Sequence, residues 1–156
     1  MPCKLTDISP ANLSDEPVKD SVRDSEQPLF HGLHAGFPAP VGNEANSIDL
    51  TREMVRHPES TFYARIAGDS MQDAGIFDGD IVVIDRSLEA RDGNFVAAFI
   101  DGEFAIKEFR SDPANRCAWL IAHNPKYPPI RVTADNDFTI WGVVTHNVHP
   151  LTHNKL

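Results

Sequence analysis

Cysteine is scarce in this 156-residue sequence, where only Cys3 and Cys117 occur. Two cysteines are too few for a disulfide framework, and their separation does not match the CxxC spacing of redox or zinc motifs. Apolar runs are also short, since none approaches the roughly 20 residues of a membrane span. The N-terminus lacks the apolar core of a secretory signal. We therefore expect a cytoplasmic protein with no membrane association.

Positively charged residues are also few compared with negatively charged ones. Fourteen Lys and Arg residues stand against 23 Asp and Glu residues, which gives a formal net charge of −9. This sign is opposite to that of a surface that binds duplex DNA through its phosphates. We expect no direct sequence-specific DNA binding, so any action near nucleic acid would pass through another protein. The hydrophobic share of 41% is that of an ordinary globular chain.

The first 30 residues differ in composition from the rest. They contain four prolines and many Ser and Asp residues, with almost no periodic apolar positions. Such a segment cannot bury enough surface to offset its chain entropy, so it predicts a flexible N-terminal arm. The Gly- and Pro-rich stretch LHAGFPAPVGNEA (33–45) follows, and a domain is expected to begin soon after it.

The remainder of the chain has the pattern of a mostly β domain. A single short helix is predicted at Asp49–His57, with Asp49 as its N-cap and Pro58 as its stop. Apolar alternation and turn signals predict strands at 61–67, 80–85, 94–100, 103–109, 118–123, 130–133 and 137–148. Asp101-Gly102 is the strongest hairpin signal. Seven closely spaced strands favour a curled β-sheet, and the absence of βαβ alternation argues against a doubly wound nucleotide-binding fold.

Ser70 is the first candidate for chemistry. It lies in Gly68-Asp69-Ser70-Met71, between a predicted strand and the Gly-rich stretch QDAGIFDGD. A serine just after a strand end can present its hydroxyl, and nearby backbone N–H groups can bind an oxyanion. The hydroxyl needs a base. A Ser-His-Asp triad stays open, but there is no GxSxG motif, and nothing selects one histidine among His31, His34, His146, His149 and His153.

Lys107 is the alternative base. It lies in the apolar strand EFAIKEF, with the same parity as Ala105 and Phe109. A lysine acts as a base only where desolvation or cationic neighbours favour the neutral amine. Periodicity by itself favours an ordinary lysine on a solvent-facing side of the sheet.

A metal site is a weaker alternative. His146, His149 and His153 are close in sequence, but a strand end and tail need not bring them together. No Cys, Asp or Glu cluster with ligand spacing accompanies them, and no P-loop, GxGxxG or HExxH motif is present. We expect neither a metal nor any other cofactor.

Four motifs, in order across residues 36–148, resemble the self-cleaving serine–lysine peptidase family shared by UmuD and LexA. They are FPAPVGNEA with IDL and GDSM, then DAGIFDGDIVVID, then DGEFAIKEF, and finally HNPKYPPIRV with FTIWGVVTH. The resemblance to the UmuD branch is the closer one. LexA-type repressors have a winged helix-turn-helix before the cleavage site, whereas the 35 residues before Gly36 are acidic and show no such pattern.

The resemblance implies a role for individual residues. Ser70 would be the nucleophile, and Lys107 the general base and later the proton donor. The main-chain N–H groups of Asp69 and Ser70 would bind the oxyanion. The scissile bond would be Ala35-Gly36, which divides the chain into an arm (1–35) removed by cleavage and a peptidase domain (36–156).

The resemblance also implies partners. A RecA–single-stranded DNA filament would activate cleavage in the SOS response. The trimmed form would act as a homodimer with an error-prone UmuC-type Y-family translesion polymerase. The alternatives are a non-catalytic binding subunit or an SOS transcriptional regulator, each with a vestigial Ser/Lys pair. A Ser–Lys signal peptidase is a further alternative, without an anchor to support it.

Overall fold

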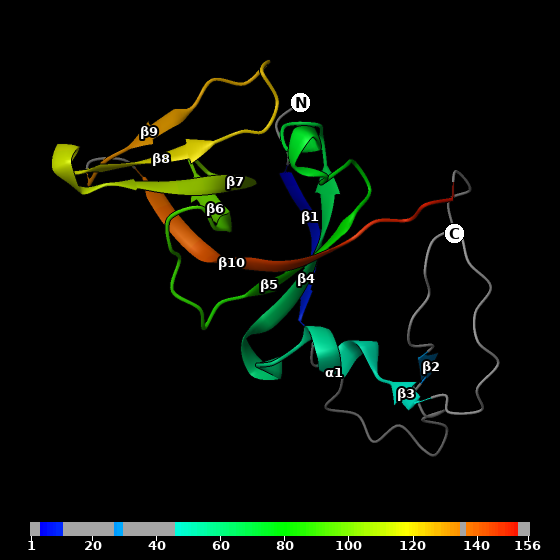
Figure 1. The fold of residues 1–156 in the computed structure, drawn as a ribbon. Helices are drawn as coiled ribbons and strands as arrows, with labels where there is room; N and C mark the ends of the chain where they lie inside the picture. The colour runs from blue at the N-terminus through cyan, green and yellow to red at the C-terminus, as the bar shows by residue number, and fades with distance from the viewer. Residues whose placement is uncertain (1–3, 11–26, 30–45, 135–136, 153–156) are drawn as a thin grey trace. The chain divides into compact units, whose positions relative to one another are not determined.

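The structure is a computed structural model that describes residues 4–10, 27–29, 46–134 and 137–152. The chain separates into two compact units, of which one contains residues 1–12 and 57–156 and the other residues 13–56. The described part of the smaller unit holds β2 (Gln27–Leu29), β3 (Asn46–Ile48) and α1 (Leu50–Met54), with β2 and β3 paired antiparallel. Figure 1 labels these elements along the chain.

Helix α1 begins where the sequence predicts. The Asp49 side chain accepts a hydrogen bond from the Arg52 backbone N–H at 3.2 Å, which satisfies one of the N–H groups left unpaired in the first turn. The helix ends at Met54, earlier than the predicted His57, because Val55 is already extended. Pro58 instead opens the short 3-10 helix η1 (Pro58–Ser60).

The larger unit is an antiparallel β-sheet. Its eight strands have the order β1-β4-β5-β10-β6-β7-β8-β9. They are β1 (Lys4–Pro10), β4 (Thr61–Ala67), β5 (Ile81–Asp85), β6 (Phe95–Ile100), β7 (Glu103–Asp112), β8 (Cys117–Ile121), β9 (Ile130–Val132) and β10 (Phe138–Val148). Short 3-10 helices lie at η2 (Gln72–Ala74) and η3 (Pro113–Asn115). The predicted mostly β fold is confirmed, and each of the seven predicted strands is present.

The sheet curls on itself, as Figure 1 shows. Strand β1 pairs with β4 and, at Lys4, also with Ala105 of β7, so strands far apart in the order meet. The β6–β7 hairpin closes at the predicted Asp101-Gly102 turn, where Ile100 pairs with Glu103. Both turn residues have positive φ, 50° and 87°, as a two-residue type I′ turn requires.

Strand β10 joins the two halves of the sheet. Its first part pairs with β6 and its second part with β5, and each ladder contains one register shift. Gly142 lies at the shift in the β6 ladder, where a Cβ atom would stand 2.7 Å from Cγ2 of Ile84 and 3.1 Å from the carbonyl oxygen of Asp85. Only glycine lets the two backbones approach this closely.

The core consists of two clusters on opposite sides of the strands. One contains Ala64, Ile66, Met71, Ile76, Val82, Ile84, Ala97 and Ile106. The other contains Val96, Ala98, Leu120 and Val132. Consecutive β6 residues enter different clusters, because side chains alternate between the two faces of a strand. The sheet is therefore covered on both faces where it carries the residues of the candidate site.

Residues 4–10 depart from the prediction of an arm without regular structure, since they form β1. Residues 27–29 of the predicted arm form β2, and the remaining arm residues, together with the predicted cleavage site Ala35-Gly36, lie outside the described residues. The division into 1–35 and 36–156 stays a prediction.

Candidate active site

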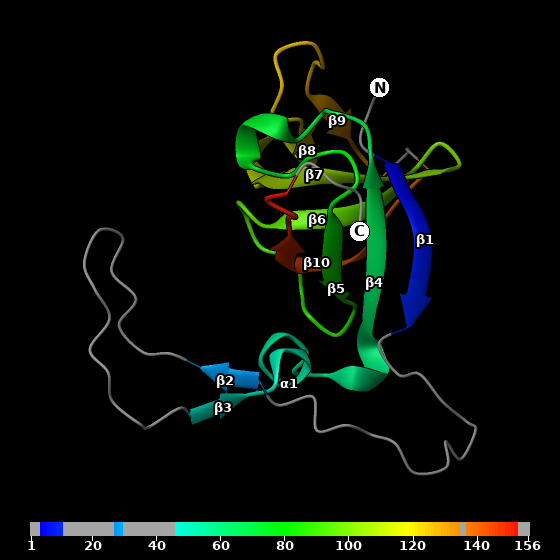
Figure 2. The same cartoon turned by 90° about the vertical axis from the view of Figure 1, so that its right-hand side faces the viewer.

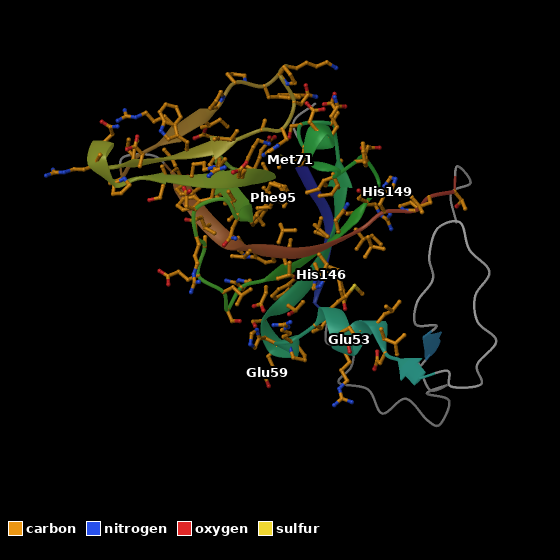
Figure 3. The ribbon with its side chains drawn as sticks, in the orientation of Figure 1. Glu53, Glu59, Met71, Phe95, His146 and His149 are labelled. Carbon is orange, nitrogen blue, oxygen red and sulfur yellow. The ribbon has the colours of Figure 1, made fainter. Side chains whose placement is uncertain are left out.

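Ser70 lies in a tight turn that leaves β4. Gly68 adopts φ 104°, a left-handed conformation that favours glycine, and its N–H donates to Oδ1 of Asp78 at 2.8 Å. Met71 is fully buried in the first core cluster, and its carbonyl accepts hydrogen bonds from the backbone of Ala74 and Ile76. The turn is thus fixed on both sides of Ser70, which is itself fully buried. Figure 3 labels Met71 beside the strands that hold the site.

Lys107 comes from the middle of β7, opposite Val96 of β6. Its relative exposure is 3%, so the solvent-facing lysine that periodicity favoured is wrong. Phe109, which has the same parity as Lys107, packs against the second core cluster. Alternation gives the parity of a residue, but the tertiary packing determines whether that side of the sheet is covered.

The fold brings Ser70 and Lys107 together although 37 positions separate them. Lys107 Nζ lies 2.8 Å from Ser70 Oγ and also donates to the carbonyl oxygen of Ile106 at 2.9 Å. The second bond fixes the direction of the amine toward the hydroxyl. Taking an ammonium group out of water disfavours its charged form, and a neutral amine in this position can accept the hydroxyl proton.

Asp69 is held by a loop that follows β8. Tyr127 donates its hydroxyl to Oδ1 at 2.6 Å, Lys126 Nζ lies 3.4 Å from Oδ2, and Asn124 Nδ2 donates to the Asp69 carbonyl at 3.0 Å. The hydrogen bond from Tyr127 and the nearby Lys126 hold the pKa of the Asp69 carboxyl well below its usual range, against a smaller opposing effect of desolvation. The residue before Ser70 is thus restrained at both side chain and carbonyl.

The loop after β8 is itself attached to η2 and to the sheet. The backbone N–H of Asp73 donates to the His123 carbonyl at 2.9 Å, and His123 Nε2 contacts Oε2 of the buried Glu108. The His123 ring also meets the edge of Phe95, with 5.5 Å between ring centroids. Sequence reasoning assigned no role to these loop residues. The available signal was the motif HNPKYPPI, which contains Asn124, Lys126 and Tyr127.

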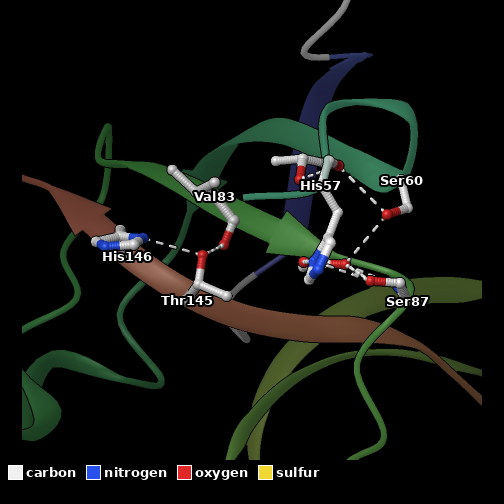
Figure 4. Close-up of polar contacts among 8 residues, drawn as sticks. His57, Ser60, Val83, Ser87, Thr145 and His146 are labelled. Carbon is white, nitrogen blue, oxygen red and sulfur yellow. Dashed lines mark hydrogen bonds and ion pairs between the residues drawn. The ribbon is translucent and has the colours of Figure 1, made fainter. Parts of the chain in front are cut away.

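A separate cluster contains serine, histidine and aspartate but is not arranged as a catalytic triad (Figure 4). Asp85 Oδ2 and Ser87 Oγ lie 2.6 Å and 3.1 Å from the same nitrogen of His57, Nδ1. A triad requires the acid and the nucleophile on opposite ring nitrogens. Burial acts to raise the pKa of Asp85, but hydrogen bonds from Ser87 and His57 outweigh it and lower that pKa. The cluster ties the start of β4 to the end of β5.

The histidines near the C-terminus have other partners. His149 Nδ1 lies 2.6 Å from Oδ1 of the fully buried Asp80, and His146 Nδ1 lies 3.0 Å from Thr145 Oγ1. Figure 3 labels both along β10 and the segment after it, and His153 lies outside the described residues. In the part of the chain that the structure describes, no group of three His, Cys, Asp or Glu residues could hold a metal ion. The same part contains no helix long and apolar enough to cross a membrane.

Comparison with known proteins places this chain in a family. The Peptidase S24-like family matches residues 28–145. Protein MucA of Salmonella typhimurium is 42% identical over 123 residues, which cover 76% of this chain and 82% of MucA. Protein SamA of Salmonella typhimurium is 37% identical over 136 residues, covering 86% and 89%. The LexA repressor of Bifidobacterium adolescentis is 33% identical over 127 residues, covering 81% of this chain and 49% of the repressor.

The match covers both the Ser70 turn and the strand that carries Lys107. The relatives MucA and SamA are matched over most of their own length, whereas the LexA repressor is matched over about half. The chain therefore belongs to the SOS-related Peptidase S24-like family, as one of its UmuD-like members.

Proposed function

We propose that this chain is a self-cleaving serine endopeptidase that cuts its own Ala35-Gly36 bond. The observation that carries the proposal is the buried contact of 2.8 Å between Lys107 Nζ and Ser70 Oγ. Membership of a serine peptidase family supports the class of reaction. The two side chains form one nucleophile–base unit that needs neither a histidine nor a metal.

The first half of the reaction forms an ester. Neutral Lys107 takes the hydroxyl proton of Ser70 as Oγ attacks the carbonyl carbon of Ala35. The oxygen of that carbonyl becomes an anion, which the main-chain N–H groups of Asp69 and Ser70 bind. The bond to the Gly36 nitrogen then breaks, and the Lys107 ammonium returns its proton to the leaving amine. The restraints on Asp69 from Asn124 and Tyr127 keep these N–H groups in place.

The second half hydrolyses the ester. Lys107, neutral again, takes a proton from water as the water oxygen attacks the Ala35 carbonyl carbon. The ester bond to Ser70 Oγ breaks, and the proton passes to Oγ. The products are a 1–35 fragment with a new carboxylate and a 36–156 fragment with a new amino terminus. Each chain is cut once.

The chain has enough reach for this step. Thirty-four residues separate Ala35 from Ser70, and an extended chain spans up to about 3.3–3.6 Å per residue. Ala35 and Gly36 are small, which suits a peptide that must bring its backbone close to a buried serine. We propose that a RecA–single-stranded DNA filament favours the docked arm, and that the trimmed form acts as a homodimer with a UmuC-type Y-family polymerase.

Intact-mass spectrometry tests the proposal. The purified chain is incubated with RecA, single-stranded DNA and ATP, and in parallel without RecA. We expect one pair of products, divided after Ala35, that accumulates faster with the filament. An uncut chain after prolonged incubation would contradict the proposal and support the binding-only subunit, and a pair divided elsewhere would remove Ala35-Gly36 from it.

A further inference from the structure

Strand β1 covers the outer edge of β4. It pairs antiparallel with it, with Lys4 opposite Ala67, Thr6 opposite Arg65 and Ser9 opposite Tyr63. On its other side β4 is bonded to β5. Figure 2 shows β1 beside β4, on the side away from β5. Residues 4–10 thus occupy what would otherwise be the edge of the sheet.

The hydrogen-bond direction of β4 identifies the groups that β1 covers. The N–H of Ile66 donates to the Asp80 carbonyl at 2.8 Å, and the carbonyl of Ile66 accepts from Gly79 at 2.9 Å. Ile66 therefore directs both backbone groups toward β5. Because these groups alternate along an antiparallel strand, Arg65 and Ala67 direct theirs toward β1.

The sequence of β1 suits an edge position. Pro10 pairs with Phe62, which has the same parity as Ile66 and so directs its backbone groups toward β5. The proline's missing N–H therefore leaves no gap in the β1–β4 ladder, and prolines in sheets are found at such edge positions. The ladder also contains a register shift between Thr6 and Ser9, a common feature of edge strands.

The covered edge leads to the candidate active site. Lys4 pairs both with Ala67, three residues before Ser70, and with Ala105, two residues before Lys107. The N-terminal end of β1 therefore joins β4, which leads into the Ser70 turn, to β7, which carries Lys107.

We propose that the outer edge of β4, together with Ala105, is a binding site for an extended peptide strand, which residues 4–10 fill in the intact chain. The site takes a segment of about seven residues, antiparallel to β4, by main-chain hydrogen bonds with Arg65 and Ala67. Release of the strand rests on the proposed function, because the cut at Ala35-Gly36 severs β1 from the domain.

The tether explains why cleavage changes occupancy. Fifty residues connect Pro10 to Thr61, and a covalent connection between a strand and its site gives an effective concentration of roughly 1 mM. Once the chain is cut, β1 competes only at the concentration of the free fragment. In a solution of about 1 μM protein this is about 1,000-fold lower. The edge of the trimmed protein is then open to another extended segment.

Hydrogen exchange in the uncut chain tests the site without any need for catalysis. The parent is the full chain with Ser70→Ala, and Thr6→Pro is added to remove the N–H opposite Arg65. Thr6→Ala, which keeps that N–H, is the matched control. We expect the amides of Arg65 and Ala67 to exchange at least 10-fold faster in Thr6→Pro, while the amide of Ile66 stays protected. A synthetic peptide of residues 1–12, at millimolar concentration, should restore protection, and a scrambled peptide should not.

Three results would overturn the proposal. Unchanged exchange at Arg65 and Ala67 in Thr6→Pro would show that β1 does not cover the edge. Loss of protection at Ile66 as well would show that β1 is an integral strand rather than an exchangeable one. Failure of the 1–12 peptide to restore protection would show that the edge does not accept strands.

A second measurement separates this proposal from self-cleavage. In the cleavage-competent chain, the Arg65 and Ala67 amides should exchange faster after the cut, and added 1–12 peptide should slow them. Continued protection of both amides after the fragment has been removed would contradict release. A chain that is never cut would count against the proposed function, while the uncut experiment would still decide the strand site.

Discussion

At the scale of single residues, the proposed chemistry depends on one short contact between two buried side chains. Ser70 and Lys107 are both almost inaccessible to solvent, and Lys107 is directed at the hydroxyl by its second bond to the Ile106 carbonyl. Neither side chain can act alone, because the hydroxyl needs a proton acceptor and the amine needs a nucleophile to activate.

Ser70→Ala and Lys107→Ala are each expected to reduce self-cleavage below detection. The double variant should be no slower than either single variant, because the two side chains act as one unit. The measurement is the appearance of the 36–156 fragment by intact mass, with circular dichroism to verify the fold. Ser87→Ala is the control, since its hydroxyl belongs to the His57 cluster and cleavage should continue. Cleavage in either single variant would exclude that residue from the mechanism.

The pH dependence of cleavage distinguishes a lysine base from a histidine base. An unperturbed lysine has a pKa of about 10.4 and an unperturbed histidine of about 6.5. Without an activator, we expect the cleavage rate to rise from pH 6 and to continue rising above pH 8. The reason is that a higher pH increases the fraction of a lysine base that is neutral. The rate of fragment appearance from pH 6 to 10 tests this. A plateau below pH 8, together with loss of activity in a single histidine variant, would contradict the lysine assignment.

Tyr127→Phe tests the restraint on Asp69. The tyrosine hydroxyl lowers the pKa of the Asp69 carboxyl, so its removal should raise that pKa toward the usual value near 3.9. A carboxyl whose pKa is lower in the folded chain than in the unfolded chain stabilises the fold at pH values above the unfolded pKa. This stabilisation is lost as the pH falls and the folded carboxyl is protonated. The difference in Tm between parent and variant should therefore be largest at pH 7 and become smaller below about pH 4.

Cleavage in Tyr127→Phe should also slow several-fold at pH 7, because the turn that presents Ser70 is less restrained. Tyr63→Phe, on β4 but outside this contact, is the comparison variant and should cleave normally. A difference in Tm that is the same at pH 7 and pH 3 would show that the hydroxyl does not act through the Asp69 carboxylate.

At the scale of elements, β10 determines how the two halves of the sheet meet. It changes partner from β6 to β5 along its length, and Gly142 lies where the backbones approach. The hairpin β6–β7 carries Lys107 on one side of this junction, whereas β4 and β5 support the Ser70 turn on the other. The contact between serine and lysine therefore depends on how β10 joins the two halves.

Gly142→Ala should destabilise the fold by about 2 kcal/mol, since the added methyl group would overlap Ile84 and press on the Asp85 carbonyl. Urea unfolding of the Ser70→Ala parent, with and without the change, measures this. Thr139→Ala is the control, because Thr139 is an exposed residue of the same strand. A change in unfolding free energy no larger than that of Thr139→Ala would show that β10 has room at this position.

At the scale of the whole molecule, self-cleavage requires that one part of the chain reach another. Ala35-Gly36 belongs to residues 13–56, whereas Ser70 and Lys107 belong to the larger unit. The proposed function therefore requires that the Ala35-Gly36 bond reach Ser70, and that the residues beside this bond fit against a buried site.

Gly36→Glu should reduce cleavage below detection, because a long charged side chain replaces a hydrogen atom next to the reacting carbonyl. Ser21→Ala, further from the bond within the predicted arm, should leave the rate unchanged. Intact mass measures both. A Gly36→Glu chain that yields products divided after residue 35 at the parent rate would show that the site does not select small residues there.

Much of the local structure follows from the sequence alone. Alternation located the seven strands, Asp101-Gly102 located the hairpin, and Asp49 located the start of the helix. The family motifs identified Ser70 and Lys107 as candidates. These features depend on residues within a few positions of one another, whose preferences act over a single strand or turn.

Only the tertiary structure determines which distant segments pack against or pair with each other. Parity placed Lys107 on the side of Phe109, but only the tertiary structure shows that Lys107 is buried and lies against Ser70. The contacts of Asn124 and Tyr127 with Asp69 span more than 50 positions, so a local sequence pattern does not predict them. Strand β1 lacks apolar periodicity and was predicted as arm, yet it forms because the edge of β4 supplies the hydrogen-bond partners that its own sequence cannot. Burial and pairing are properties of two distant segments together, so neither segment by itself could reveal them.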